Sequence, residues 1–425
     1  MSTLRRLWKR HIPAPLSEVS GRLYLRGRAI RAHVRHGFPS RGLRLIGVTG
    51  TNGKTTTCEY ISSIITHAGR RVGTSSTATM RVGPRVWRNS SGLTTGTPEA
   101  LCRLLEGMRA SEVREAVLEV SSHALAQHRV WGLEFDWAVV TNLTPDHLNY
   151  HRTMDAYADT KAALVTGARR AVVLNRDDEW FEFFRGRAKA PVFSFGWSKD
   201  ADLCLDRVQS LGPEGSQVDF HLRGVRRRLH VRLPGRFNVL NALTAVATGE
   251  ALDLPWCHIR RGVEEVKAVP GRMETISTAS GSTVVIDYAH TPEAVRAAVG
   301  FLEENSTGRV ISVLGSSPSH DAFGVGREAG TFSDLVVVTD EEPYWVPPAD
   351  LRKMVAQGVR DGGRAEVQEV ADRRNAIGHA LKQAGPQDTV AVLGMGVQPT
   401  RQFGERSIPW DERAVVEELI RGMET

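Results

Sequence analysis

Residues 45–57 read LIGVTGTNGKTTT, and this stretch decides how the rest of the chain is interpreted. Its first four residues have the apolar character of a buried strand that is about to end. From Thr56 onward, an apolar stripe that includes Tyr60, Ile61 and Ile64 indicates a helix. A glycine-rich turn between a strand and a helix directs backbone N–H groups and the positive helix end toward one point. The stretch therefore predicts a binding site for a nucleoside triphosphate.

The turn itself supplies the candidate nucleotide ligands, which are Gly50, Thr51, Asn52, Gly53, Lys54, Thr55 and Thr56. Lys54 adds a positive charge for the β- and γ-phosphates, and the hydroxyl of Thr55 is placed to bind Mg²⁺. The strict P-loop pattern has a glycine six positions before the lysine, where this chain has Val48. Gly47 and Gly50 provide the flexibility instead.

The composition is ordinary for a soluble globular protein, and we expect a cytoplasmic location. A chain of 425 residues with 41% hydrophobic and 24% charged residues is long enough for two or three domains with buried cores. No apolar run is long enough to cross a membrane, and no signal peptide is evident. The four cysteines are scattered, which favours reduced thiols over disulfides or a zinc site. We attribute the net charge of +7 to scattered arginines and an anionic substrate, and expect no nucleic-acid partner.

Residues 1–40 form a short basic N-terminal segment in which Glu18 is the single acid. Apolar residues are interleaved with its arginines, so we expect an amphipathic helix over about residues 16–36. Two roles remain open for this helix. It either packs on the following domain or makes a weak peripheral contact with an anionic membrane surface.

From residue 41 onward, strand and helix patterns alternate, which predicts an α/β fold with mostly parallel, doubly wound sheets. We expect a central ATP-binding domain over residues 41–270 and a Rossmann-like C-terminal domain over residues 271–425. Residues 192–233 carry short strands and glycine turns, and are interpreted as an antiparallel insertion. Pro270 and Gly271 are interpreted as a hinge.

Polar residues follow the predicted strands of the central domain. Glu119 stands at the end of one strand, before Ser121, Ser122 and His123. Asp146 and His147 follow the next strand, and Lys161 lies on the helix after it. Ligands bind at the carboxyl ends of parallel strands, so these residues are candidates for the second half of a Mg²⁺–nucleotide site.

Several motifs in the same order resemble the Mur ligase family, and within it the synthetases that add the third residue of the peptidoglycan stem peptide. The motifs are GTNGKTTT (50–57), LEVSSHAL (118–125), NLTPDHLNYH (142–151), a lysine ten residues later, GRFNVLNALTA (235–245), PGRMETI (270–276) and DYAHTP (287–292). The resemblance implies an ATP- and Mg²⁺-dependent ligase. A substrate carboxylate would attack the γ-phosphate to form an acyl phosphate, and a substrate amine would then displace phosphate to form an amide.

The resemblance also implies roles for single residues. Glu119 would bind the first Mg²⁺, His147 would help to hold a second metal ion, and Lys161 would be carbamylated, becoming an acidic ligand. Arg272 would lie near the γ-phosphate after domain closure. Nucleotide contacts are further expected from Asn238, Asn241, Asp287 and His290, and substrate contacts from Thr97, Ser121, Ser122, His123, Glu341, Glu342, Tyr344 and Gln398.

The residues that depart from the family pattern are mostly those expected to bind the substrates, and fewer are those expected to bind ATP. The stem-peptide members carry an N-terminal domain for the UDP-sugar, and we expect this chain to lack it. The family's Asp-Asn-Pro-Arg, whose arginine binds the distal carboxylate of diaminopimelate, is replaced by residues 341–344, EEPY. Its Gly-Lys-Gly-His-Glu loop is replaced by GMGVQ (394–398), and the charged run after Gly315 by SSPSHDAFGVGRE (316–328).

We therefore expect a ligase that acts on a carboxylate without UDP, such as a specialised metabolite, and on an amine other than diaminopimelate. Two alternatives remain. One is a stem-peptide ligase with a degenerate first domain, and the other is a nucleotide-binding regulatory protein without ligase activity.

Overall fold

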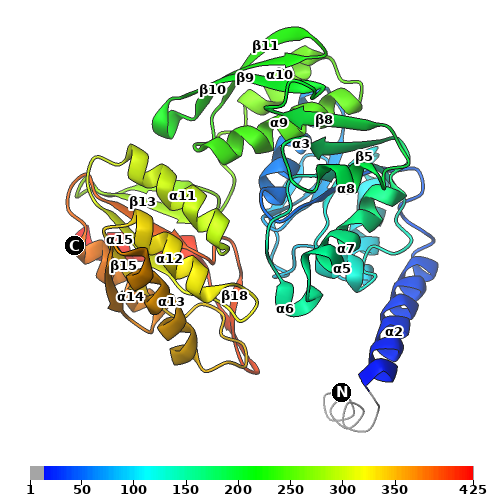
Figure 1. The fold of residues 1–425 in the computed structure, drawn as a ribbon. Coiled ribbons are helices and arrows are strands. Elements are labelled where there is room, and N and C mark those ends of the chain that lie inside the picture. Colours follow the sequence, from blue (N-terminus) through cyan, green and yellow to red (C-terminus); the bar gives the residue numbers. More distant parts are fainter. Residues whose placement is uncertain (1–13, 425) are drawn as a thin grey trace.

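The computed structural model describes residues 14–424, and the basic stretch 1–13 lies outside this range. Each of its two large sheets carries helices on both faces (Figure 1). We call the first sheet with its helices the central domain and the second the C-terminal domain. This arrangement confirms the predicted α/β class with mostly parallel sheets.

The first sheet has the strand order β11-β10-β9-β8-β7-β6-β1-β5-β2-β3-β4. Seven neighbouring strands run parallel: β2 (Val72–Ser75), β5 (Glu115–Glu119), β1 (Arg44–Thr49), β6 (Phe135–Val140), β7 (Ala171–Asn175), β8 (Val192–Gly196) and β9 (Leu203–Ser210). Antiparallel strands complete both edges: β3 (Thr79–Val82) and β4 (Arg85–Arg88) on one side, β10 (Ser216–Leu222) and β11 (Val225–Val231) on the other. The sequence predicts an antiparallel insertion over residues 192–233, but only the pairs β9–β10 and β10–β11 are antiparallel, whereas β8 is parallel to both of its neighbours. All four strands continue the main sheet.

Strand β1 is apolar on both faces because helices cover both sides of the sheet. Ile46 and Val48 belong to a core formed with α3 (Lys54–His67), α9 (Arg236–Ala251) and α10 (Trp256–Glu264). Leu45 points to the opposite core, which includes α4 (Pro98–Ala110), α7 (Met154–Gly167) and α8 (Phe181–Arg185). Three short helices complete the domain: α5 (Ser122–Ala126), α6 (Leu148–His151) and the 3₁₀ helix η1 (Gly212–Glu214).

Helix α2 (Ala14–Arg35) precedes the central domain, close to the expected range 16–36. It packs on α4, where both Arg28 guanidinium donors contact the Glu99 carboxylate at 2.8 Å and Ala32 is buried. Leu23 and Val34 stay exposed on its outer side. The packing role proposed for this segment is thereby confirmed for its described part. Within residues 14–424, no helix is long and apolar enough to cross a membrane.

The second sheet has the order β12-β13-β17-β14-β15-β16. Its strands are β12 (Glu274–Ser277), the only antiparallel one, then β13 (Thr283–Asp287), β17 (Thr389–Leu393), β14 (Val310–Leu314), β15 (Leu335–Val338) and β16 (Glu366–Glu369). Helices α11 (Pro292–Asn305), α12 (Ala322–Phe332) and α13 (Pro348–Gly362) cover one face; α14 (Arg373–Gln383) and α15 (Glu412–Glu424) cover the other. A hairpin of β18 (Thr400–Phe403) and β19 (Arg406–Pro409) stands apart from the sheet.

Close packing of α3 against α10 fixes the helix that follows the glycine-rich turn. A Cβ atom on Gly262 would lie 2.4 Å from the backbone Cα of Ile64. We expect Gly262→Ala to destabilise the protein by about 1–3 kcal/mol, because the two helices would have to separate. Gly107 is a matched control within α4, since a Cβ there would meet no atom within 4 Å.

Gly107→Ala should stabilise the fold by about 0.5–1 kcal/mol through helix propensity alone. Urea unfolding of both variants followed by circular dichroism measures the difference. Equal effects of the two substitutions would contradict the close packing of α3 and α10.

Candidate functional site

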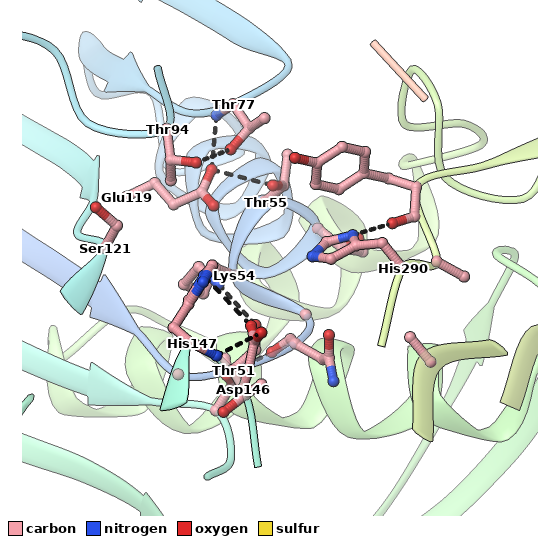
Figure 2. Close-up of a pocket in the computed structure, with 18 of the residues that line it drawn as sticks. Thr51, Lys54, Thr55, Thr77, Thr94, Glu119, Ser121, Asp146, His147 and His290 are labelled. Atoms are coloured by element: carbon pink, nitrogen blue, oxygen red, sulfur yellow. Dashed lines mark hydrogen bonds and ion pairs between the residues drawn. The ribbon is translucent and has the colours of Figure 1, made fainter. Parts of the chain in front are cut away.

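A pocket of about 720 Å³ opens between the two domains. Its walls combine the turn after β1, the segments after β5 and β6, the start of α9 and several loops of the C-terminal domain. Both sheets present the carboxyl ends of parallel strands to it, as the rule for ligand sites in α/β folds requires. Figure 2 shows the side chains around the turn after β1.

The turn before α3 is shaped to receive an anion. Gly53 adopts a left-handed φ of 80° at the helix N-cap, and no side chain caps the first N–H groups. A Cβ atom at this position would lie 2.0 Å from Oδ1 of Asn241, so only glycine fits. The half-buried Lys54 folds back and its Nζ donates to the Thr51 carbonyl at 2.7 Å. The free N–H groups, the helix end and the ammonium group together form a phosphate-binding site.

Glu119 lies beside the Thr55 hydroxyl at the start of α3 (Figure 2). Its Oε2 accepts hydrogen bonds from Thr55 Oγ1 at 3.0 Å and from the Thr77 backbone N–H at 2.6 Å. Arg272 of the C-terminal domain donates to the same threonine hydroxyl, with an Nη2–Oγ1 distance of 3.0 Å. A buried carboxylate next to a hydroxyl is the donor set that Mg²⁺ prefers.

His147 occupies a strained position, with a left-handed φ of 53°. Its Nδ1 is buried and has no hydrogen-bond partner among the described residues. Burial lowers the pKa of this imidazole to about 3, so that it is neutral at pH 7 and keeps a free lone pair. An unpartnered, neutral ring nitrogen beside the phosphate-binding turn fits a metal ligand.

Lys161 lies on α7 with only 1% of its surface exposed. Its Nζ donates to the Gly50 carbonyl at 2.7 Å and lies 4.5 Å from the ring centroid of Tyr157. Burial lowers the pKa of Lys161 well below its usual range, and the charge of Lys54 lowers it further. The neutral amine is the form that reacts with carbon dioxide, so the surroundings of Lys161 favour carbamylation.

The expected nucleotide residues outside the turn also line the pocket. Asn241 donates to Asn238 Oδ1 at 3.1 Å and thereby fixes two amides at the start of α9. Asp287 accepts from the backbone N–H groups of Met273 and Ala289, at 2.7 and 2.8 Å, so it holds the loop after β13 in place.

Among the expected substrate residues near β5, Ser121, Ser122 and His123 line the pocket. Thr97 does not line it in this structure. Its side chain instead accepts from the Ala100 N–H as the N-cap of α4. Thr94, three residues earlier, reaches the pocket in its place.

In the loop after β15, the side chains of two neighbouring glutamates point to different sides. Glu342 and Tyr344 line the pocket together with Gln398, as expected. Glu341 does not line it: the side chain turns into the domain, is 5% exposed, and its Oε2 has no hydrogen-bond partner within residues 14–424. Consecutive residues of an extended segment point to opposite sides, which explains why only Glu342 faces the pocket.

Several pocket residues had not been assigned from the sequence: Thr77, Thr94, Arg129, Tyr157 and His320. The strand-end rule, extended along the whole segment after β5, would have included Arg129. This arginine donates to the Thr95 carbonyl at 3.0 Å and brings a cation to the wall near Ser121. No spacing in the sequence indicates that His320, from the other domain, meets Asp146.

Comparisons with known proteins agree with this geometry. The Mur ligase middle domain matches residues 48–249, and the Mur ligase glutamate ligase domain matches residues 271–396. A UDP-N-acetylmuramoyl-L-alanyl-D-glutamate–2,6-diaminopimelate ligase of Caldanaerobacter subterraneus is 33% identical over 401 residues, which are 92% of this chain and 82% of the relative. The corresponding ligase of Geobacter metallireducens is 35% identical over 422 residues, covering 91% and 80%.

Solved structures show the same fold. The structure of a UDP-N-acetylmuramoyl-L-alanyl-D-glutamate–2,6-diaminopimelate ligase aligns with a TM-score of 0.63 and 25% identity, covering 94% of this chain and 83% of that one. A Mycobacterium tuberculosis folylpolyglutamate synthase with ADP and AMPPCP aligns with a TM-score of 0.70 and 21% identity, covering 89% and 96%. With the phosphate-binding turn and the buried carboxylate of the pocket, these matches show that the chain belongs to the Mur ligase family, whose members are ligases that use ATP with Mg²⁺ to form amide bonds.

Proposed function

We propose that this protein joins a small-molecule carboxylate to an amine by way of an acyl phosphate, in the pocket between its two domains. The convergence of Lys54, Glu119, His147, Lys161 and Arg272 on one pocket carries the proposal. These residues come from five separate segments of the chain and from two domains, and a protein that only bound a nucleotide would have no need of the whole set.

Phosphoryl transfer depends on positioning and on neutralising charge. We assign the N–H groups of the turn and Lys54 to the β- and γ-phosphates, and Arg272 to the transferred group. Thr55 and Glu119 would hold Mg²⁺, whose charge compensates that of the phosphate oxygens. The orphaned Nδ1 of His147 and the carbamate of Lys161 would serve a second ion. Asn238, Asn241, Asp287 and His290 would contact the rest of the nucleotide.

The wall formed by residues 342–344 and 398–402 supports a proposal for the amine. The side chains that line the pocket from these segments are Glu342, Tyr344, Gln398, Thr400 and Gln402. None of them is cationic. A distal carboxylate on the amine would meet Glu342 without a donor of opposite charge, and an unpaired buried carboxylate costs several kcal/mol. An amine with a cationic or neutral distal end fits this wall better than diaminopimelate.

For the carboxylate partner, we propose a molecule without a UDP group. Arg129, near Ser121 and His123 in the pocket wall, offers a cation to the carboxylate of this partner. A UDP-linked muramyl peptide is the alternative that the curated relatives suggest.

A cytoplasmic location and the absence of a nucleic-acid partner also remain proposals, as does a domain boundary at residues 270 and 271.

Loss of the lysine in the turn tests the nucleotide site. We expect Lys54→Ala to lower ATP-dependent product formation by about a hundredfold or more, because a preorganised cation on the phosphates is removed. Phosphate release with pooled amino acids and candidate carboxylates measures the effect, and circular dichroism checks the fold. Wild-type turnover in Lys54→Ala would contradict the assignment. A wild-type protein that binds ATP but never releases phosphate would favour the regulatory alternative.

Carbamylation of Lys161 has a separate test. Lys161→Ala should lose activity, because the metal-binding carbamate is gone, and should regain part of it when acetate or another short carboxylate is added. Lys199→Ala, at an exposed position, is the matched control for any general effect of acetate. Incubation with ¹³C-bicarbonate should give a carbamate signal in the NMR spectrum of the wild type. Full activity of Lys161→Ala without additive would exclude a metal-supporting role.

Amine selectivity can be measured by competition among diaminopimelate, lysine, ornithine and neutral amino acids at equal concentration. We expect diaminopimelate to be disfavoured by up to about a thousandfold, which corresponds to several kcal/mol. Burial, together with the charge of Glu341, raises the pKa of Glu342 to about 7. Glu342 therefore becomes charged as the pH rises through 7, and the preference for a cationic amine should increase over that range.

Glu342→Gln should weaken that preference and its pH dependence, whereas Glu366→Gln, on the exposed part of β16, should change neither. If diaminopimelate is the best amine for the wild type, the proposed amine class is wrong.

A further inference from the structure

Asp146, His290 and His320 form a cluster at the junction of the two domains. Asp146 follows β6 in the central domain, whereas the histidines come from the loops after β13 and β14 in the C-terminal domain. One potential ligand atom from each side chain lies within 4.8 Å of the other two. Nδ1 of His320 is already 3.1 Å from Oδ1 of Asp146. Two imidazoles and a carboxylate with such spacing are a common set of ligands for transition metals.

The surroundings of His290 fix which nitrogen is free. Its Nδ1 donates to the Tyr288 carbonyl (Figure 2), so the other ring nitrogen, Nε2, carries the lone pair. Burial lowers the pKa of His290 to about 3, which keeps the ring neutral at pH 7. Histidines that bind metals usually donate their second ring N–H to a carbonyl or carboxylate in this way. This hydrogen bond is a second observation, independent of the spacing, that points to a ligand.

Asp146 is suited to share a cation with the histidines. The residue is 9% exposed. A buried carboxylate beside two imidazoles is suited to bind a cation that compensates its charge.

The cluster differs from the site assigned to Mg²⁺ at Thr55 and Glu119, and its ligands are not those assigned to a second ion, His147 and Lys161. Mg²⁺ prefers oxygen ligands, whereas this cluster offers two nitrogens for each oxygen. His320 also lies in residues 316–328, the stretch that is expected from the sequence to depart from the family pattern.

We propose that Asp146, His290 and His320 bind a divalent transition-metal ion of the zinc class, and that this ion joins the C-terminal domain to the central domain. Tetrahedral zinc with bonds of about 2.0–2.1 Å needs ligand atoms about 3.3 Å apart. The Asp146–His320 pair is close to this separation, and a ring nitrogen of His290 lies within 4.8 Å of both partners. With three protein ligands, the fourth position is open to water or to a substrate oxygen.

Cobalt binding provides the test, because four-coordinate Co²⁺ with nitrogen ligands absorbs visible light. The full chain is dialysed against Co²⁺ with a large excess of Mg²⁺, which saturates the oxygen sites, and without any nucleotide. We expect one retained Co²⁺ per chain with a visible spectrum, and displacement of Co²⁺ by Zn²⁺. Because no turnover is measured, the result does not depend on the proposed ligase reaction.

Variants of ligand residues from both domains test whether the metal ion joins the two domains. His320→Ala and Asp146→Asn should each weaken Co²⁺ binding by about tenfold or more. The control is His67→Ala, at the far end of α3 and about 20 Å along the helix from its N-terminus. Should His320→Ala fold poorly, His320→Gln and a Zn²⁺-dependent rise in the unfolding temperature of the wild type take its place.

Three results would overturn the proposal. The first is a wild-type protein that retains no Co²⁺ and shows no stabilisation by Zn²⁺. The second is binding that survives in His320→Ala or Asp146→Asn, and the third is binding that falls equally in His67→Ala.

Discussion

A triphosphate with its cations can be held only where backbone N–H groups, a positive charge and carboxylates converge on one point. The parallel sheet of the central domain meets this demand, because β1, β5 and β6 all end at the same edge. Each neighbouring strand then contributes a different part of the site: the turn after β1, Glu119 at the end of β5, and His147 beyond β6. Most other features of the central domain, including the two-sided core of β1, serve to keep these three strand ends in register.

The C-terminal domain completes the pocket through a small number of polar contacts. Arg272 donates to the Thr55 hydroxyl at 3.0 Å, Asn52 to the Thr291 hydroxyl at 3.4 Å, and His320 lies 3.1 Å from Asp146. Such contacts are each worth about 0.5–1.5 kcal/mol and exchange readily with water. They can therefore form when substrates are bound and break when product leaves, which suits a reaction that has to exclude water from an acyl phosphate.

The sequence predicted the parts of the fold and site that depend on local pattern. The turn at residues 50–57, the carboxylate at the end of β5 and the lysine on α7 stand at spacings that a strand–helix alternation makes meaningful. The sequence could not predict those side-chain positions and contacts that depend only on the path of the folded chain. Thr97 has the residue type of a substrate contact, but it caps α4. Glu341 and Glu342 are alike in sequence, yet backbone direction sends them to opposite sides of the loop. The meeting of Asp146 with His320 joins residues 174 positions apart, and no local pattern encodes it.

The edges of the long first sheet have a consequence for the behaviour of the protein in concentrated solution. An edge strand exposes unpaired N–H and C=O groups, and invites pairing with a strand of another molecule. At one edge, β11 carries three consecutive arginines, Arg226 to Arg228. Asp219 of β10 forms ion pairs with two of them and so neutralises only part of their charge. At the other edge, Arg88 of β4 is tied to Asp411 and to the Val397 carbonyl of the C-terminal domain. Two molecules that approached through β11 would bring arginine against arginine, so this sheet can span eleven strands without serving as a template for aggregation.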